Sequence, residues 1–564
     1  MESSQIRKLF LDFFEKNGHK IVPSSSLLPS DPSVLFTTAG MQQFKPYYMG
    51  EKSPYGLNVV SCQKCFRTTD IEEVGDERHL TFFEMLGNFS FGGYFKERAI
   101  KLAHEFIVKE LKLEIDYVTI FSPEKVIDGD WRKNIPEDKD SYKIWKDIGV
   151  PEIKIRKEGI DNFWGPTGDQ GPCGATTEIY VNGIEIWNLV FNEYFCDTEK
   201  NLKKIDPPGV DTGSGFERLV AVVQKKNTIF ETDLFVPIVK EIIANDQRVQ
   251  RIIADHIRSC VFLISEGVLP SNKDRGYILR RLIRRMTGLE KRFNLPIDFI
   301  IKLIPIVINS YQSIYPEIKT KETEIIDVIK NEIERFEKSL EKGILHFQKL
   351  VEAKTEKLIS GNEAFDLYQS YGFPLDLIEE LAKEKNFKID KNGFQNSLEK
   401  HQEISRAGVE KKFGGVGANA DHQAARLHTA THLLHQALRT VLGDHVEQSG
   451  SDINSERLRF DFSHTQKMTQ EEIKRVEDLV NQKIKEDLEV IKEQMSFKEA
   501  KDKGALAFFK EKYPEIVNVY SIGSFSKEVC GGPHIDRTSE LKEFKIIKEE
   551  SSGAGIRRIK AVLK

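Results

Sequence analysis

The chain has 564 residues, which is too many for one hydrophobic core and indicates three or four domains. Its 39% hydrophobic and 30% charged residues are typical of a globular protein, and the absence of a long apolar run excludes a membrane protein. The net charge of −5 excludes a strongly basic protein but permits a local basic surface for a nucleic acid. Six unevenly spaced cysteines argue against a disulfide framework, and we expect a cytoplasmic protein.

Residues 1–235 contain many aromatic residues, glycines and strand-like runs, which predict a mixed α+β region with an antiparallel sheet. The segment EIYVNGIEIWNLVFNEYF (178–195) alternates on both sides of Asn182-Gly183. This dipeptide is typical of a two-residue turn, so the segment predicts a β-hairpin.

The rest of the chain divides into three parts. Residues 236–405 have the apolar spacing of helices, as in ILRRLIRRMTGLEKRF. Residues 406–425 contain the glycine-rich stretch KKFGGVGANADHQ, which predicts a linker. Residues 426–564 return to a mixed pattern and end in strand-like segments such as IRRIKAVL, which indicates a further α+β domain.

The segment HTATHLLHQAL (428–438) carries three histidines on a predicted helix. His428 and His432 are four residues apart and share one helix face, and His435 shares a face with His432. The later segment CGGPH adds Cys530 and His534 around a glycine turn. One thiolate with several imidazoles is a common ligand set for zinc. Spacing leaves two readings open: a closed structural site, or a site that activates water for hydrolysis.

Three segments of the N-terminal region combine charged residues with glycines or aromatic residues. CFRTTDIEEVGDERHLTFFEMLGNFSFGGYF (65–95) places Arg67 before an aromatic run, and VDTGSGFERLVAVVQ (210–224) places Asp211 and Arg218 around glycines. Arginines can bind phosphates, and glycines let a ligand approach the backbone. DNFWGPTGDQGPCGATTEIY resembles a pocket-lining loop. The alternatives are core aromatics on paired strands and an ordinary helix start.

Taken together and in this order, these segments resemble the alanyl-tRNA synthetases, a family of class II aminoacyl-tRNA synthetases, along the whole chain. The stretches that carry the resemblance include TFFEMLGNFSFGGYF, EIWNLVFNEY, VDTGSGFERL, RGYILRRLIRR, HTATHLLHQALR and CGGPH. The resemblance implies an α+β multidomain fold. Its expected parts are an antiparallel-sheet aminoacylation domain (1–235), a helical tRNA-recognition domain (236–405), the linker (406–425) and an α+β zinc-containing editing domain (426–564).

The resemblance implies that the N-terminal domain activates L-alanine with ATP and Mg²⁺ and transfers it to the 3′ end of tRNA(Ala). Asp211 would hold the alanine ammonium, Arg67 the α-phosphate and Arg218 the terminal phosphates. The other residues that the family pattern assigns to these ligands are His79 and Phe83 for ATP, and Trp164, Val190 and Gly213 for alanine.

The helical domain of this family reads a G·U pair in the acceptor stem. The positions that match its tRNA contacts are Asn272, Gln369, Arg280 and Arg281. Gln369 stands where the pattern has an aspartate, and an amide can donate as well as accept hydrogen bonds, so the recognition rule can differ. A solvated helix face is the alternative for the arginines.

A pocket for alanine cannot strongly exclude glycine or serine, so the family edits mischarged Ser-tRNA(Ala) and Gly-tRNA(Ala) at a second site with one zinc ion. The residues that match its zinc ligands are His428, His432, Cys530 and His534, and Gln448 matches a further pocket residue. His435 has no ligand role in the pattern. Pro533 stands where the pattern has threonine, which reshapes the turn but keeps both ligands.

The chain matches a short form of the family that lacks its usual C-terminal domain. That domain often supports dimerisation, so we expect a monomer. An alternative from another class is a trans-editing deacylase with an inactive synthetase half. Arg67, Asp211 and Arg218 are all present, which favours the ligase.

Overall fold

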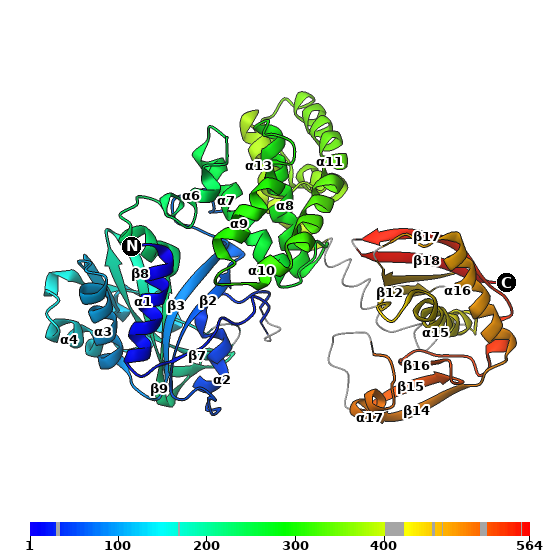
Figure 1. Ribbon diagram of the computed structural model, residues 1–564, viewed down its shortest axis with the longest axis horizontal. Helices are drawn as coiled ribbons and strands as arrows, with labels where there is room; N and C mark the ends of the chain where they lie inside the picture. Colours follow the sequence, from blue (N-terminus) through cyan, green and yellow to red (C-terminus); the bar gives the residue numbers. More distant parts are fainter. Residues whose placement is uncertain are drawn as a thin grey trace. The chain divides into compact units, whose positions relative to one another are not determined.

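The computed structural model forms two compact units, residues 1–357 with 366–388, and residues 358–365 with 389–564 (Figure 1). Most of the predicted linker, including its glycine-rich stretch, lies outside the described residues. In the part that is described, no helix has the length and apolar character needed to span a membrane. The structure describes residues 1–29, 34–166, 168, 170–400, 422–453, 457–464, 466–507, 516–553 and 555–564.

The first unit is built around one large sheet, as the sequence predicts. Its strands are β1 (Lys20–Ile21), β2 (Asn58–Phe66), β3 (Phe82–Phe91), β4 (Tyr117–Phe121), β5 (Ile155–Glu158), β6 (Phe163–Trp164), β7 (Gly171–Val181), β8 (Ile184–Cys196) and β9 (Leu202–Gly215). They follow the order β1-β2-β3-β9-β8-β7-β4-β5, with β6 paired to β7. The central pairings are antiparallel, and only β1 with β2 and β4 with β5 run parallel.

The predicted hairpin is confirmed. Val181 of β7 pairs with Ile184 of β8, and Asn182-Gly183 forms the turn between them. Both turn residues have positive φ angles, 53° and 69°, which asparagine and glycine adopt more readily than other residues.

Helices cover the sheet through aromatic contacts. In α1 (Ser3–Lys16), Phe10 and Phe14 lie on one face and are fully buried. The Phe10 ring lies 5.5 Å from the ring of Trp187 on β8, which fixes α1 against the sheet (Figure 1). The other helices near these strands are α2 (Lys45–Tyr48), α3 (Lys96–Glu105), α4 (Lys139–Asp147) and α5 (Phe216–Val223).

The helical pattern predicted after residue 235 is also confirmed. The helices are α6 (Val236–Val239), α7 (Gln247–Ser265), α8 (Asp274–Arg292), α9 (Phe299–Tyr311), α10 (Glu317–Thr320), α11 (Glu322–Glu352), α12 (Gly361–Tyr371) and α13 (Leu375–Glu384). Two short strands, β10 (Leu358–Ile359) and β11 (Lys388–Ile389), interrupt them. α7 begins at a conventional cap, because the Asp246 carboxylate accepts hydrogen bonds from the amides of Arg248 and Val249.

The C-terminal part of the second unit contains two antiparallel sheets with helices. Its elements are α15 (His422–Leu442), β12 (Gln448–Ile453), β13 (Leu458–Ser463), α16 (Gln470–Lys485), β14 (Val490–Ser496), α17 (Phe497–Asp502), β15 (Ile516–Ile522), β16 (Ser526–Val529), β17 (Phe544–Gly553) and β18 (Ile556–Leu563). The sheets have the orders β12-β13-β18-β17 and β14-β15-β16.

α15 begins earlier than the linker prediction of 406–425 allows. Its first four residues are His422 to Ala425, and both Ala424 and Ala425 are buried. Ala425 belongs to the same core as Leu427 and Leu434 further along the helix. The glycine-rich composition before them obscured this helix start.

Candidate functional site

A cavity of about 310 Å³ lies on one face of the large sheet. Residues spaced by two along a strand share a face, so β9 contributes Asp211, Gly213 and Gly215 to its wall. The full lining is Ala39, Arg67, Asp70, Arg78, His79, Leu80, Phe83, Met85, Trp164, Glu178, Glu185, Asn188, Val190, Asp211, Gly213, Gly215, Glu217 and Arg218.

All the residues predicted to bind ATP or alanine line this one cavity: Arg67, His79, Phe83, Trp164, Val190, Asp211, Gly213 and Arg218. They come from segments far apart in the chain, and the sheet brings them together. Sequence reasoning missed Glu178, Asn188 and Glu217. Strand alternation could have found Asn188, because it is two residues from Val190 on β8.

The end of the cavity next to Asp211 combines a buried carboxylate with small or apolar neighbours. Val190 of β8 lies directly opposite Asp211 of β9. Gly213 follows on the same face, where a Cβ atom would come within 2.9 Å of the Met85 sulfur. A glycine at this position therefore keeps the cavity open beside Asp211.

Three carboxyl groups in the cavity have raised pKa values. Burial raises the pKa of Asp211 to about 7. Burial, followed by the neighbouring Glu185 carboxylate, raises the pKa of Glu178 to about 7. Burial also raises the pKa of Glu217 to about 7, although Arg258 opposes it. Asp211 and Glu178 therefore favour a cationic ligand, whereas Glu217 already pairs with Arg258 at 2.9 Å.

Two arginines provide positive charge in the same cavity. The Arg67 Nε donates to the carbonyl of Thr38 at 3.2 Å, and its guanidinium lies 5.0 Å from the centre of the Phe83 ring. A nitrogen of Arg218 lies 3.1 Å from a Glu185 oxygen. These contacts orient both side chains, and guanidinium groups bind phosphate oxygens strongly.

The loop between β2 and β3, which carries several lining residues, is held by helices α7 and α8. Arg285 of α8 donates to the carbonyl of Ile71 at 2.7 Å, and Arg251 of α7 donates to the carbonyl of Gly75 at 3.3 Å. Asp255 of α7 accepts hydrogen bonds from both the amide and the hydroxyl of Thr81, at 2.9 and 2.6 Å. The helical region thus supports one wall of the cavity.

The residues predicted to contact tRNA lie in the helical region, but three of them, Asn272, Arg280 and Arg281, have protein partners. Arg280 pairs with Glu332 at 3.1 Å and also donates to the side chain of Asn272. Arg281 pairs with Asp376 at 2.9 Å. The two arginine side chains are each 15% exposed, so they are neither a solvated face nor free cations. Gln369 lies on α12.

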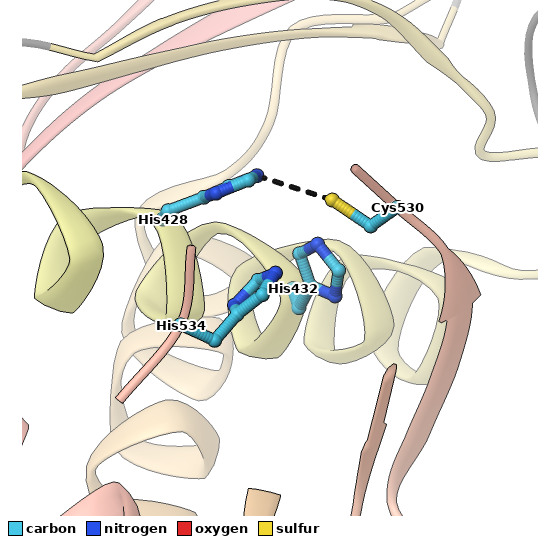
Figure 2. A group of neighbouring side chains, drawn as sticks. All are labelled: His428, His432, Cys530 and His534. Atoms are coloured by element: carbon cyan, nitrogen blue, oxygen red, sulfur yellow. Dashed lines mark hydrogen bonds between the residues drawn. The ribbon is translucent and has the colours of Figure 1, made fainter. Parts of the chain in front are cut away.

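A second site lies in the C-terminal part of the chain. His428 and His432 of α15 converge with Cys530 and His534, and their ligand atoms all lie within 4.8 Å of one another (Figure 2). The Cys530 sulfur is 3.4 Å from the Nε2 of His428. A Cβ atom at Gly532 would come 2.1 Å from the His428 ring, which explains the glycine in CGGPH.

The contacts around the four side chains fit a metal site. His428 uses its Nδ1 to contact the carbonyl of Pro533 at 3.2 Å, and Thr429 contacts the Nδ1 of His534 at 3.1 Å. The Nε2 of His534 is buried and has no hydrogen-bond partner among the described residues. The rings of His428 and His534 are therefore each oriented through one nitrogen, while the other is available to an ion.

The ionisation of the Cys530 thiol also suits metal binding. Burial raises the pKa of Cys530, but hydrogen bonds from His428 and His432 outweigh burial and bring it to about 2. The thiolate is the metal-binding form of cysteine. One thiolate with three imidazoles fits Zn²⁺.

Two other residues predicted or considered for this region lie outside the four-ligand group. His435 is buried and contacts Glu528 at 3.0 Å. Gln448 begins β12 and donates to the Ser451 hydroxyl at 3.1 Å.

The family comparisons agree with this architecture. The model of class II (A) tRNA synthetases matches residues 5–448, and the model of the threonyl and alanyl tRNA synthetase second additional domain matches residues 517–560. The antiparallel sheet with its charged cavity is thus that of a class II aminoacyl-tRNA synthetase.

Full-length relatives identify the branch of this class. The alanine–tRNA ligase of Borreliella afzelii (strain PKo) is 46% identical and is aligned over 100% of both chains. That of Treponema pallidum (strain Nichols) is 43% identical over 100% of this chain and 98% of its own. That of Dehalococcoides mccartyi (strain CBDB1) is 35% identical over 99% of this chain and 80% of its own. The chain belongs to the alanine–tRNA ligase family.

Proposed function

We propose that the chain activates alanine with ATP and Mg²⁺, releasing pyrophosphate, and transfers the alanyl group from the adenylate to the 3′ end of tRNA(Ala). The observation that carries this proposal is the pairing of Asp211 with Val190 in a cavity that also contains two arginines. This arrangement suits a small amino acid whose carboxylate lies next to a phosphate.

In this proposal Asp211 accepts the ammonium of alanine, and Val190, Trp164 and Gly213 surround its methyl group. Binding the cation restores the charged form of a carboxyl group that burial otherwise neutralises. The apolar wall rejects larger side chains sterically, but it distinguishes alanine from glycine or serine only weakly.

Arg67 and Arg218 neutralise the phosphates of ATP, with His79 and Phe83 beside them. The alanine carboxylate attacks the α-phosphorus and pyrophosphate leaves; the terminal ribose hydroxyl of the tRNA then attacks the alanyl carbonyl and AMP leaves. No covalent enzyme intermediate is needed, so the residues act by positioning and by charge. Glu178 supplies a carboxylate at the same cavity for the Mg²⁺ that accompanies ATP.

Because the first site would discriminate only weakly between alanine and serine or glycine, a second site that hydrolyses the mischarged products is needed. We assign to it the hydrolysis of Ser-tRNA(Ala) and Gly-tRNA(Ala), with His428, His432, Cys530 and His534 holding one zinc ion. When bound, zinc supplies a Lewis acid for ester hydrolysis. The buried thiolate and the oriented imidazoles support this ion, and Gln448 is proposed as a further pocket residue.

We place tRNA on the helical region through Asn272, Gln369, Arg280 and Arg281. A phosphate would compete with Glu332 and Asp376 for the two arginines, and a contact to the Asn272 oxygen would compete with its hydrogen bond from Arg280.

The test is aminoacylation of tRNA(Ala) by the purified chain with labelled alanine and ATP-Mg²⁺. Charging that depends on both tRNA(Ala) and alanine is expected. Hydrolysis of Ser-tRNA(Ala) without any charging would instead identify a trans-editing deacylase.

A further inference from the structure

The third histidine of HTATHLLHQAL is fully buried but is not part of the four-ligand group. The Nδ1 of His435 lies 3.0 Å from Oε1 of Glu528. Glu528 is on β16, two residues before the ligand Cys530, and its side chain is 5% exposed. A carboxylate this deeply buried needs partners that offset its desolvation.

The other oxygen of Glu528 faces a zinc ligand. Its Oε2 lies 3.7 Å from the Nδ1 of His432, which makes no hydrogen bond within the described part of the chain. One carboxylate therefore spans two imidazoles on successive turns of α15. With Nδ1 facing Glu528, we assign the Nε2 of His432 to the ion.

We propose that Glu528 and His435 are positioning residues of the metal site: Glu528 orients and polarises His432, and His435 holds Glu528 in place. This inference rests on the proposed zinc site. Carboxylate partners of ligand histidines fix the ring orientation and raise the basicity of the ligand.

Charge balance supports the same arrangement. A zinc dication with one thiolate and three neutral imidazoles keeps one positive charge. The site is buried, so this charge is poorly screened by water. The Glu528 carboxylate lies beside a ligand and compensates for it. His435 also packs against Phe460, with the two rings 5.2 Å apart. Packing alone would not account for the contact between His435 and the Glu528 carboxylate.

The experiment measures zinc affinity of the full chain by competition with a chromophoric chelator. Glu528→Gln keeps the shape of the side chain but removes its charge, and it is expected to weaken zinc binding about 10- to 100-fold. His435→Leu removes the donor to Glu528 and is expected to weaken it less. His435→Gln retains an N–H donor and is expected to recover part of that loss.

A double substitution tests whether His435 acts through Glu528. In the Glu528→Gln background, His435→Leu should cause little further loss of zinc affinity, because the group that it supports has lost its charge. Fully additive losses of zinc affinity would overturn the proposal that His435 acts through Glu528. His445→Leu is the matched control, since His445 contacts His464 at 2.9 Å and neither residue belongs to the metal group.

Controls distinguish a failure of the inference from a folding defect and from a failure of the proposed function. Circular dichroism and thermal unfolding report whether each variant is folded, because alanine-dependent pyrophosphate exchange occurs in the other compact unit and does not report on this one. If the unchanged protein binds no zinc, the proposed editing function fails and the inference fails with it. If the unchanged protein and Glu528→Gln bind zinc equally, only the inference is overturned. If Glu528→Gln does not fold, equal zinc affinity of the two His435 variants and the unchanged protein overturns the inference.

Discussion

Val190 and Asp211 lie directly opposite each other in the pairing of β8 with β9. Directly opposed residues of an antiparallel pair point to the same face, with Cβ atoms about 4.5–5.5 Å apart. An apolar wall and a carboxylate are therefore held at a separation set by the sheet. The methyl and ammonium groups of alanine are attached to one carbon atom, and this pair of side chains can contact both.

Asp211→Asn tests the ammonium contact. The substitution keeps the shape of the side chain but removes its charge, so the kcat/KM for alanine in pyrophosphate exchange should fall roughly 100-fold. Zinc content and hydrolysis of Ser-tRNA(Ala) should not change, because that site lies elsewhere in the chain. Unchanged kcat/KM for alanine would contradict the role given to Asp211.

The raised pKa of Asp211 predicts a pH dependence. The carboxyl pKa is about 7 because the group is buried, and only the ionised form can pair with an ammonium. The KM for alanine should therefore rise as the pH falls below about 7. Pyrophosphate exchange between pH 5.5 and 8.5 (roughly a decade on each side of this value) measures it. A KM that does not change over this range would contradict the assignment.

The same carboxyl groups affect stability without ligand. The folded-state pKa values of Asp211, Glu178 and Glu217 are all raised to about 7. The folded protein thus disfavours their charged forms, and the stabilising contribution of the protonated groups is lost as the pH rises from about 4, their ordinary pKa, to about 7. Alanine with ATP should reduce this loss. Thermal unfolding at several pH values, with and without both ligands, tests the expected difference.

Val190→Ala shortens a side chain of the apolar wall and so enlarges the pocket. One or two missing methyl groups change discrimination by about 1–3 kcal/mol, so exchange with serine relative to alanine should increase about 10-fold. The zinc site then has more Ser-tRNA(Ala) to hydrolyse. A ratio of serine to alanine exchange equal to that of the unchanged protein would contradict the role of Val190 in amino-acid selection.

Arg285→Lys tests the support of the ATP side by α8. Lysine keeps the charge but cannot make the same contacts as a guanidinium, so the loop loses the hydrogen bond to the carbonyl of Ile71. The KM for ATP in exchange should rise several-fold, with less effect on kcat. Arg284→Lys is the control, because Arg284 contacts Glu332 and Gly372 instead. Equal effects of the two substitutions would argue against a specific support.

Two adjacent glycines provide a matched test of the metal site. A Cβ atom at Gly532 would come 2.1 Å from the ring of His428, whereas one at Gly531 meets nothing within 4 Å in the described structure. Gly532→Ala should therefore abolish zinc binding and hydrolysis of Ser-tRNA(Ala), and Gly531→Ala should preserve both. Alanine exchange should persist in both variants. Zinc analysis after gel filtration distinguishes them.

The local sequence pattern was enough to predict the hairpin at Asn182-Gly183, because a turn dipeptide between two alternating segments is compatible with few other structures. Local pattern also singled out Arg67, Asp211 and Arg218, but their grouping in one site was reached only through the resemblance, because Arg67 and Asp211 are far apart in the chain. The ion pair of Arg281 was not predictable, because Asp376 lies 95 residues away and no local period links them. The role of His435 depends in the same way on Glu528, which is 93 residues away.

ATP–pyrophosphate exchange with alanine, serine and glycine supplied separately tests the central claim most directly. The geometry around Asp211 and Val190 predicts strong exchange with alanine and weaker, measurable exchange with serine and glycine. This result would also give a reason for the hydrolysis of mischarged tRNA that we propose for the second site. No exchange with any of the three amino acids would contradict the ligase and leave the His428–His534 site as the working part of the protein.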